Sequence, residues 1–228
     1  MTPLHSLFTQ TMSLTVHELR TPVTVIGGYL RMLLKEQGGP LTEKQRKMLE
    51  EAERSCGRVG ALVNEMSELG KFEGGEIALP RERIDLPELL TRVAADMHEG
   101  ENRGVQLDLR GAQSPLMVVG DRGRLEAALR ALLHAALRER GEPGVIVAEC
   151  SVTSNDPPSV LITIGDDDAR RTLGSAAPED APFDEWRGGL GLALPLARRV
   201  IEAHGGALWS APGDRARAGS AVKLPLEK

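Results

Sequence analysis

The chain has 228 residues and a formal net charge of −5, with 41% hydrophobic, 27% charged and only 3% aromatic residues. This apolar content is too high for a disordered chain and allows one medium domain or two small ones. No apolar run is long enough for a membrane span, and the mild acidity argues against a nucleic-acid-binding protein. The two cysteines, Cys56 and Cys150, fit a reducing compartment better than a disulfide framework. We therefore expect a cytoplasmic protein without membrane contact.

The N-terminal residues predict a long helix with a single apolar seam. The seam residues recur at alternating spacings of four and three: Met12, Val16, Leu19, Val23, Ile26, Leu30 and Leu33. Such a heptad repeat is typical of helices that pack in a bundle or coiled coil. The Gln37-Gly38-Gly39-Pro40 segment should end this helix, because glycine and proline together cannot continue it.

A second helix is predicted from Thr42 to about Gly74-Gly75. Thr42 and Gln45 have the spacing of a capping box at its start. The apolar seam then resumes with the same alternation: Leu49, Ala52, Cys56, Val59, Val63 and Met66. Two seamed helices joined by a short turn form a hairpin, which cannot cover its own apolar faces. We therefore expect a homodimeric four-helix bundle.

The composition changes after Pro80, and the remaining sequence predicts an α+β domain. Strands are expected at 105–110, 116–120, 144–150, 159–164, 206–210 and 219–224, and helices at 122–139 and 190–204. The apolar face of the first of these helices comprises Leu125, Leu129, Leu132, Leu133 and Ala136. From residue 165 to Gly188 we expect only a polar segment. The expected fold is a helical hairpin over 1–78, followed over 79–228 by a mixed, largely antiparallel sheet with its helices on one face.

His17 stands out on the first helix because the seam excludes it from the core. It lies one position beyond Val16, with Glu18 beside it and Thr21 one turn further on the same face. Pro22 leaves the Glu18 carbonyl without its helical partner, and the continuing seam predicts a tolerated kink there. From these residues alone His17 could be an ordinary surface histidine or a reactive one.

The segment Val16-His17-Glu18-Leu19-Arg20-Thr21-Pro22-Val23 resembles the H-box of two-component sensor histidine kinases. The resemblance extends to Leu62-Val63-Asn64-Glu65-Met66 and Lys71-Phe72-Glu73-Gly74-Gly75, which match the usual end of the dimerisation and phosphoacceptor domain of this family. It implies that His17 accepts the phosphoryl group and that Glu18 is the general base. It also implies that Thr21 positions water for dephosphorylation of a response regulator. The expected partners are a second copy of the chain and a response-regulator receiver domain.

Residues 79–228 resemble the ATP-binding domain of the same kinases, a member of the gyrase-type ATPase superfamily. Arg187-Gly188-Gly189-Leu190-Gly191-Leu192-Ala193 resembles the second glycine box, and 203–206 and 219–225 resemble the closing strands. The resemblance implies binding of ATP and Mg²⁺. The residues expected to contact nucleotide are Asp166, Gly189, Leu190, Gly191 and Arg138. Asp166 would accept a hydrogen bond from the adenine amino group, and Arg138 would meet a phosphate. A strand-end turn for Asp166 and a solvated helix face for Arg138 remain open alternatives.

Several nucleotide-site motifs of the family are altered in this chain. Ala131 and Ala135 replace two family asparagines, of which the second helps to hold Mg²⁺, and alanine has no ligand atom. No residue is therefore assigned as a metal ligand. Asp167 to Arg170 replace the glycine-containing turn after Asp166, which removes the residues that adopt positive φ freely. Residues 166–185, which include the expected ATP lid, contain seven acidic and two basic residues, a net charge of −5 that equals that of the whole chain.

Three hypotheses follow for the function. The chain could be a working histidine autokinase, in which metal and positioning drive phosphoryl transfer. It could be a degenerate kinase in which His17 acts as an ATP-independent phosphotransferase or phosphatase station. It could also be a scaffold that only binds partners. The intact H-box disfavours the scaffold, and the altered motifs disfavour normal ATP use, so we expect a histidine-kinase core with impaired use of ATP.

Overall fold

The computed structural model describes residues 3–75, 77–111, 114–153, 158–175, 182–185, 191–210 and 219–227. The chain divides into two compact units, residues 1–77 and 78–228. No helix in the described part of the chain is long and apolar enough to cross a membrane.

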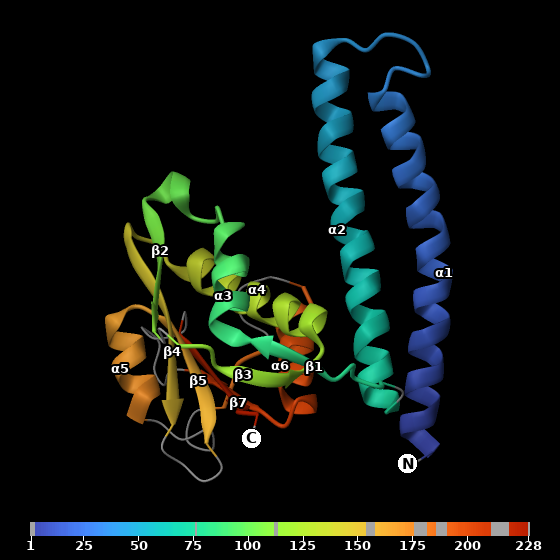
Figure 1. Ribbon diagram of the computed structural model, residues 1–228. Helices are drawn as coiled ribbons and strands as arrows, with labels where there is room; N and C mark the ends of the chain where they lie inside the picture. Colours follow the sequence, from blue (N-terminus) through green and yellow to red (C-terminus); the bar gives the residue numbers. More distant parts are fainter. Residues whose placement is uncertain are drawn as a thin grey trace. The chain divides into compact units, whose positions relative to one another are not determined.

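The first unit is the predicted helical hairpin, formed by α1 (Pro3–Leu34) and α2 (Glu43–Gly74) (Figure 1). The capping box is present, since the Gln45 N–H donates to Thr42 Oγ1 and the Thr42 N–H donates to Gln45 Oε1 at 2.9 Å. Arg46 closes the turn by donating to the Leu34 carbonyl at 3.3 Å and to Glu36 Oε1 at 2.5 Å. These contacts join the start of α2 to the end of α1.

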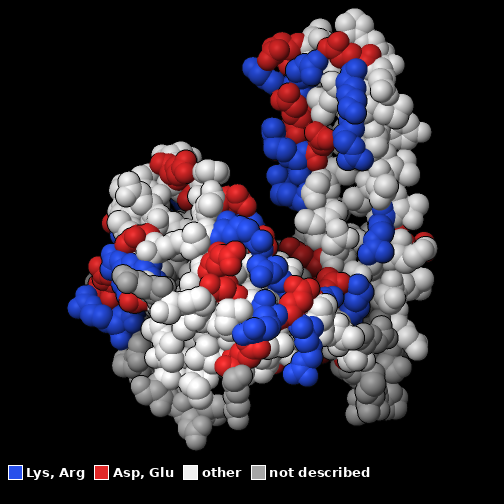
Figure 2. Space-filling model, viewed as in Figure 1, with Lys and Arg blue, Asp and Glu red and all other residues white. Residues whose placement is uncertain are grey.

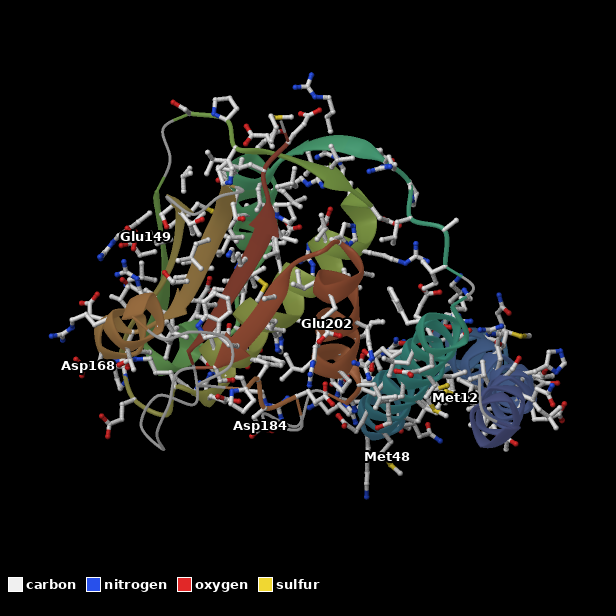
Figure 3. The ribbon with its side chains drawn as sticks, turned by 90° about the horizontal axis from the view of Figure 1, so that it is seen from below. Met12, Met48, Glu149, Asp168, Asp184 and Glu202 are labelled. Atoms are coloured by element: carbon white, nitrogen blue, oxygen red, sulfur yellow. The ribbon has the colours of Figure 1, made fainter. Side chains whose placement is uncertain are left out.

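The predicted seam separates into two rows in the hairpin. One row faces the other helix, and Val16 and Val63 are almost completely buried there. Met12 also points toward α2 (Figure 3), where a Cβ on Gly70 would lie 3.5 Å from the Met12 Sδ. Other seam residues remain exposed, among them Leu19 (40%), Ile26 (53%), Leu33 (39%) and Val59 (44%). A single hairpin therefore leaves part of its apolar seam uncovered.

The second unit contains a five-stranded mixed sheet and a separate two-stranded ribbon (Figure 1). The sheet has the order β2 (Val105–Gly111), β4 (Gly144–Thr153), β5 (Ser159–Gly165), β7 (Ser220–Pro225) and β6 (Ala207–Ser210). Among the strand pairs within the described ranges, only β2–β4 is parallel. The ribbon pairs β1 (Glu82–Asp85) with β3 (Met117–Gly120) in antiparallel fashion. The expected mixed, largely antiparallel sheet is confirmed.

One face of this sheet is covered by α3 (Leu86–Ala95), α4 (Arg122–Glu139) and α6 (Ala193–Ala203) (Figure 1). A 3-10 turn at Glu101–Arg103 lies between α3 and β2. All five residues of the predicted apolar face of α4 are buried, and the helix packs against β2, β4 and β5. The sequence patterns predict neither α3 nor β1. Each is short, and α3 begins with Leu86-Pro87 directly after a strand, so neither provides a long periodic signal.

The prediction of a purely polar segment after residue 165 is wrong for residues 167–175, which form helix α5 (Asp167–Ser175). This helix packs on the other face of the sheet, where Ala169 and Leu173 contact Trp209 and Ala221 (Figure 1). Only these two buried anchors, one turn apart, mark its apolar side, which explains why periodicity missed it. The helices of the second unit therefore cover both faces of the sheet, unequally.

The junction between β3 and α4 is closed by His204, the residue that follows the last turn of α6. His204 Nδ1 donates to the Val200 carbonyl at 2.7 Å, and its Nε2 accepts from the Asp121 N–H at 2.9 Å. Gly120 makes this approach possible, because a Cβ at that position would overlap the imidazole ring. Asp121 in turn caps α4 by accepting from the Arg124 N–H at 3.0 Å. Burial alone would raise the pKa of Asp121, but the hydrogen bonds and charge of Arg124 hold this pKa below its ordinary value.

Candidate phosphoacceptor site and nucleotide-binding face

His17 lies on the exposed side of α1, with 77% of its side chain accessible. Its Nδ1 is 3.3 Å from Oε1 of Glu18, whose side chain is also largely exposed. When Nδ1 carries the proton, this contact is a hydrogen bond to the carboxylate, and Nε2 keeps its lone pair. The arrangement therefore presents a nucleophilic nitrogen to solvent, with a proton acceptor on the opposite side of the ring.

Thr21 is exposed one turn further along the same helix, and α1 continues through Pro22 without interruption. Within the described part of the chain the Thr21 hydroxyl has no hydrogen-bond partner, whereas Thr15 and Thr24 donate to carbonyls one turn back. The hydroxyl of Thr21 is thus available to a water molecule or a visiting partner. The structure places His17, Glu18 and Thr21 on one accessible surface.

A groove of about 590 Å³ runs beside His17 between the two helices of the hairpin. Met12 and Gly70 contribute to its floor, and Arg20 and Lys71 contribute basic side chains to its lining. Two basic groups near an exposed imidazole favour the approach of an anionic group such as a phosphoryl oxygen or a carboxylate.

Asp166 lies where β5 ends and α5 begins, and both of its carboxylate oxygens have donors. Oδ1 accepts from the Ala169 N–H at 2.9 Å, so Asp166 caps α5. Oδ2 is paired with Arg140 Nη1 at 3.2 Å. Asp166 is thus a turn residue at the end of a strand, as one of the two alternatives from the sequence has it. Its contact with adenine remains a prediction.

The acidic run after Asp166 is not an open loop. Asp167 and Asp168 form the first turn of α5, where carboxylates interact favourably with the helix dipole. Asp167 pairs with Arg170 at 3.2 Å, and Asp168 pairs with Arg171. The missing glycines cause no strain here, because Glu36 is the only non-glycine residue with positive φ in the described part of the chain. Local pairing therefore offsets much of the charge that the sequence places beside the expected triphosphate.

Arg170 also links α5 to the sheet through an ion pair. Its guanidinium pairs with Glu149 on β4, and only 15% of the side chain is exposed. Burial, followed by the positive charge of Arg110, lowers the pKa of Arg170. Glu149 and Asp168 lie on the same side of the sheet (Figure 3). Here, as over much of the visible surface, basic and acidic side chains are intermixed, and neither sign forms a continuous patch (Figure 2).

The residues of α4 at the expected metal site provide no oxygen ligand. Ala135 is completely buried in the core, and Ala131 is partly exposed. His134 is turned to Glu99, with Nε2 3.3 Å from Oε2. Arg138 is exposed, and its backbone carbonyl accepts a hydrogen bond from Arg103. No group of three His, Cys, Asp or Glu side chains in the described ranges could hold a metal ion.

Of the expected glycine box, Gly189 and Leu190 lie outside the described residues. Gly191 is described; its φ is 66°, and it lies in the turn before α6, whose first turn contains no acidic residue. A helix start without carboxylates is compatible with a nearby phosphate.

Sequence reasoning did not single out Ser220 as a site residue. It is fully buried on β7, where it pairs with Ile164 of β5. Ile164 lies two residues before Asp166 in the chain. Its hydroxyl has no partner among the residues described. The sequence feature that could have identified it is the alternation along β7: Ser220 is a polar residue on the side of the strand that also carries Val222 and Leu224.

The described residues therefore fit a nucleotide only in part and do not fit Mg²⁺. An inward hydroxyl and a helix start free of carboxylates are present at Ser220 and α6. However, Ala135, at the position of the family asparagine, is a buried alanine, and Asp166, the carboxylate expected to contact the base, is already paired with the Arg140 guanidinium.

Known proteins resemble this chain in sequence. Residues 4–75 match the His Kinase A (phospho-acceptor) domain. The chain is 30% identical over 224 residues to the sensor histidine kinase GacS of Pseudomonas protegens, a match that covers 92% of this chain and 24% of GacS. It is 30% identical over 204 residues to the signal transduction histidine-protein kinase BarA of Escherichia coli, covering 83% of this chain and 22% of BarA. The chain thus spans about a quarter of the length of these curated relatives.

The fold is also shared with a solved structure. The crystal structure of full-length ShkA in complex with AMPPNP matches with a TM-score of 0.74 at 23% identity, covering 96% of this chain and 46% of ShkA. This match shows the fold alone. The phosphoacceptor domain over residues 4–75 and the relatives that match most of the chain assign it to the sensor histidine kinases of two-component systems.

Proposed function

We propose that this chain is a histidine-kinase core that carries a phosphoryl group on His17 and passes it to the aspartate of a response-regulator receiver domain. The observation that carries the proposal is the exposed His17–Glu18 pair on a rigid helix. Thr21, on the same surface, would position water when the phosphoryl group is removed from the regulator.

The chemistry requires a nucleophilic nitrogen and an acceptor for the imidazole proton. Nε2 of His17 attacks the phosphorus of the donor, and the bond between phosphorus and its leaving group breaks: a P–O bond in ATP, which releases ADP, or a P–N bond in phosphoramidate, which releases ammonia. Glu18 accepts the proton from Nδ1, which prevents positive charge from building up on the ring. In the forward transfer the regulator carboxylate attacks the same phosphorus, the N–P bond breaks, and the proton returns to the imidazole.

The two units would have separate roles. Residues 1–78 form the dimerisation and phosphoacceptor domain, working as a homodimer, and residues 79–228 form an ATP-binding-like catalytic domain. Asp166, Gly189, Leu190, Gly191 and Arg138 are its proposed nucleotide contacts, with Ser220 added from the structure. The buried Ala135 and the Asp166–Arg140 pair support weakened handling of ATP and Mg²⁺. Both cysteines are free thiols, in keeping with action in the cytoplasm.

The test is phosphorylation of the purified chain with phosphoramidate and, separately, with γ-labelled ATP and Mg²⁺. We expect phosphoramidate to give an acid-labile phosphohistidine that is absent from His17→Gln. ATP should give much less label than phosphoramidate.

His98→Gln is the control, because His98 is also an exposed histidine paired with a glutamate. Label that survives in His17→Gln would contradict the assignment of the phosphoacceptor. If neither donor labels the chain and a phosphorylated receiver domain also fails, the scaffold alternative would replace this proposal. Strong ATP labelling would contradict impaired ATP use alone.

A further inference from the structure

Arg140 and Asp166 form an ion pair that takes no part in the proposed phosphoryl transfer at His17. Arg140 follows the last turn of α4, and its Nη1 lies 3.2 Å from Asp166 Oδ2. Three quarters of the Arg140 side chain and nearly two thirds of that of Asp166 are removed from solvent. Screening by water is therefore reduced compared with a surface pair.

Backbone packing fixes the position of the Arg140 guanidinium. It lies directly against Gly144 at the start of β4, where a Cβ would overlap Nη2. Gly144 has a φ of 153°, and the Nε of Arg140 is buried without a partner within the described ranges. The lost hydrogen bond at Nε indicates that the geometry is set by the carboxylate and by Gly144, rather than by optimal solvation of the arginine.

The consequence concerns the second oxygen of the carboxylate. Oδ1 is committed to the cap of α5, so Oδ2 is the oxygen left to meet a ligand, and Arg140 already donates to it. A charged guanidinium forms a stronger hydrogen bond to a carboxylate than a neutral amino group does. An adenine amino group would have to displace this donor or share the oxygen with it.

We infer that Arg140 is a specificity-determining residue that competes internally with the nucleobase for Asp166 and lowers the affinity of this domain for adenine nucleotides. The inference rests on the proposed function, in which Asp166 is the base contact. Part of the weak nucleotide binding is then caused by the Arg140 guanidinium next to the proposed nucleobase contact. This cause is independent of the metal ligand that is missing at Ala135.

The test measures nucleotide affinity of the full chain by calorimetry, with ATP and with inosine triphosphate, which has a carbonyl in place of the amino group. Arg140→Met keeps an unbranched aliphatic side chain and removes the guanidinium that lies against Gly144 and donates to Asp166. We expect the dissociation constant for ATP to fall about tenfold, the size of effect that about 1.4 kcal/mol would produce. The affinity for inosine triphosphate should not rise, because its carbonyl gains nothing from a freed carboxylate.

Two further variants keep the result interpretable. Arg140→Lys retains a cation beside Asp166 and should bind ATP much as the unaltered chain does. Arg130→Met removes an arginine of α4 that pairs with Glu126 and Asp96 at the surface, and it should change neither affinity. Thermal unfolding without nucleotide checks that each variant is folded.

An ATP affinity that is unchanged or lower in Arg140→Met would overturn the inference. So would an equal gain for inosine triphosphate, or the absence of measurable ATP binding in every variant. Phosphoramidate labelling of His17 in the same samples separates the two proposals. Label without the affinity change refutes only the competition at Asp166, whereas the affinity change without label refutes only the phosphoacceptor role of His17.

Discussion

At the scale of single residues, the His17–Glu18 contact is the simplest functional element of the chain. Both side chains are exposed, so their geometry depends on the helix rather than on a pocket. Neighbouring residues of a helix point in different directions, yet the long Glu18 side chain reaches back to Nδ1. The pair is therefore visible from the sequence once the helix is known.

We expect Glu18→Gln to slow phosphorylation of His17 by phosphoramidate by about a hundredfold or more, because the imidazole loses its proton acceptor. The fold should be unaffected, since Glu18 is not part of the core. Initial rates of acid-labile label, measured across pH, check this. Glu43→Gln, at another exposed helix position, should keep the normal rate and pH profile; equal slowing in both variants would refute a role specific to Glu18.

Cys150 gives a prediction for alkaline pH. Burial, with a smaller contribution from Asp85, raises the pKa of its thiol to about 12. The thiol in the unfolded chain ionises near its ordinary pKa of about 8.5–9. The unfolded state therefore loses its proton first, and the stabilisation from a neutral Cys150 is complete below about pH 9 and lost progressively up to about pH 12.

The expected loss from this group approaches 1.4 kcal/mol per pH unit in that range. Chemical unfolding followed by tryptophan fluorescence is suitable, because both tryptophans lie beyond residue 180 in the second unit. The stability difference between the unaltered chain and Cys150→Ala should shrink as pH rises above 9. A pH-independent difference would contradict the buried neutral thiol.

At the scale of elements, the helix and strand boundaries follow from signals of unequal strength. Sustained apolar seams predicted α1 and α2, with a glycine-containing stop after each helix and a capping box at the start of α2, and an apolar face predicted α4. Helix α5 has only two buried anchors, and its acidic start was interpreted as a loop. What decides α5 is its contact with Trp209 and Ala221, which come from strands far along the chain. Local sequence does not reveal such partners.

The β3–α4 junction allows an element-scale test. We expect Gly120→Ala to destabilise the second unit by about 1–3 kcal/mol, because its Cβ would overlap His204 and displace the hydrogen bond to the Asp121 N–H. Gly123→Ala is the matched control, since a Cβ there meets only Asp121 Oδ1 at 3.6 Å on an exposed helical surface. It should be neutral or stabilising. Equal unfolding free energies for the two variants would contradict this account.

At the scale of the whole molecule, the exposed seam row argues for association. Leu19, Ile26 and Leu33 recur every seven residues on α1, and each remains substantially exposed in a single hairpin. A second hairpin placed against this row would complete a four-helix core. This is the physical basis of the proposed homodimer.

Ile26→Glu should convert the dimer to monomer, with dimerisation weakened about a hundredfold or more, because the charge would be buried opposite its symmetry mate. Val25→Glu introduces the same charge at an equally exposed neighbouring residue outside the seam and should leave the dimer intact. Sedimentation equilibrium distinguishes the two. A dimer that persists in Ile26→Glu, or an unaltered chain that is monomeric, would contradict assembly through this row.

The sequence alone determined the hairpin, the mixed sheet with helices, and the exposure of His17, because these depend on periodicity and on short-range spacing. It also located the altered motifs at Ala131, Ala135 and Asp167–Arg170. Only the tertiary structure decided that Asp167 and Asp168 begin a helix, that Asp166 is paired with Arg140, and that Ser220 is buried. These features depend on contacts between residues far apart in the chain, and neither propensity nor local spacing contains that information.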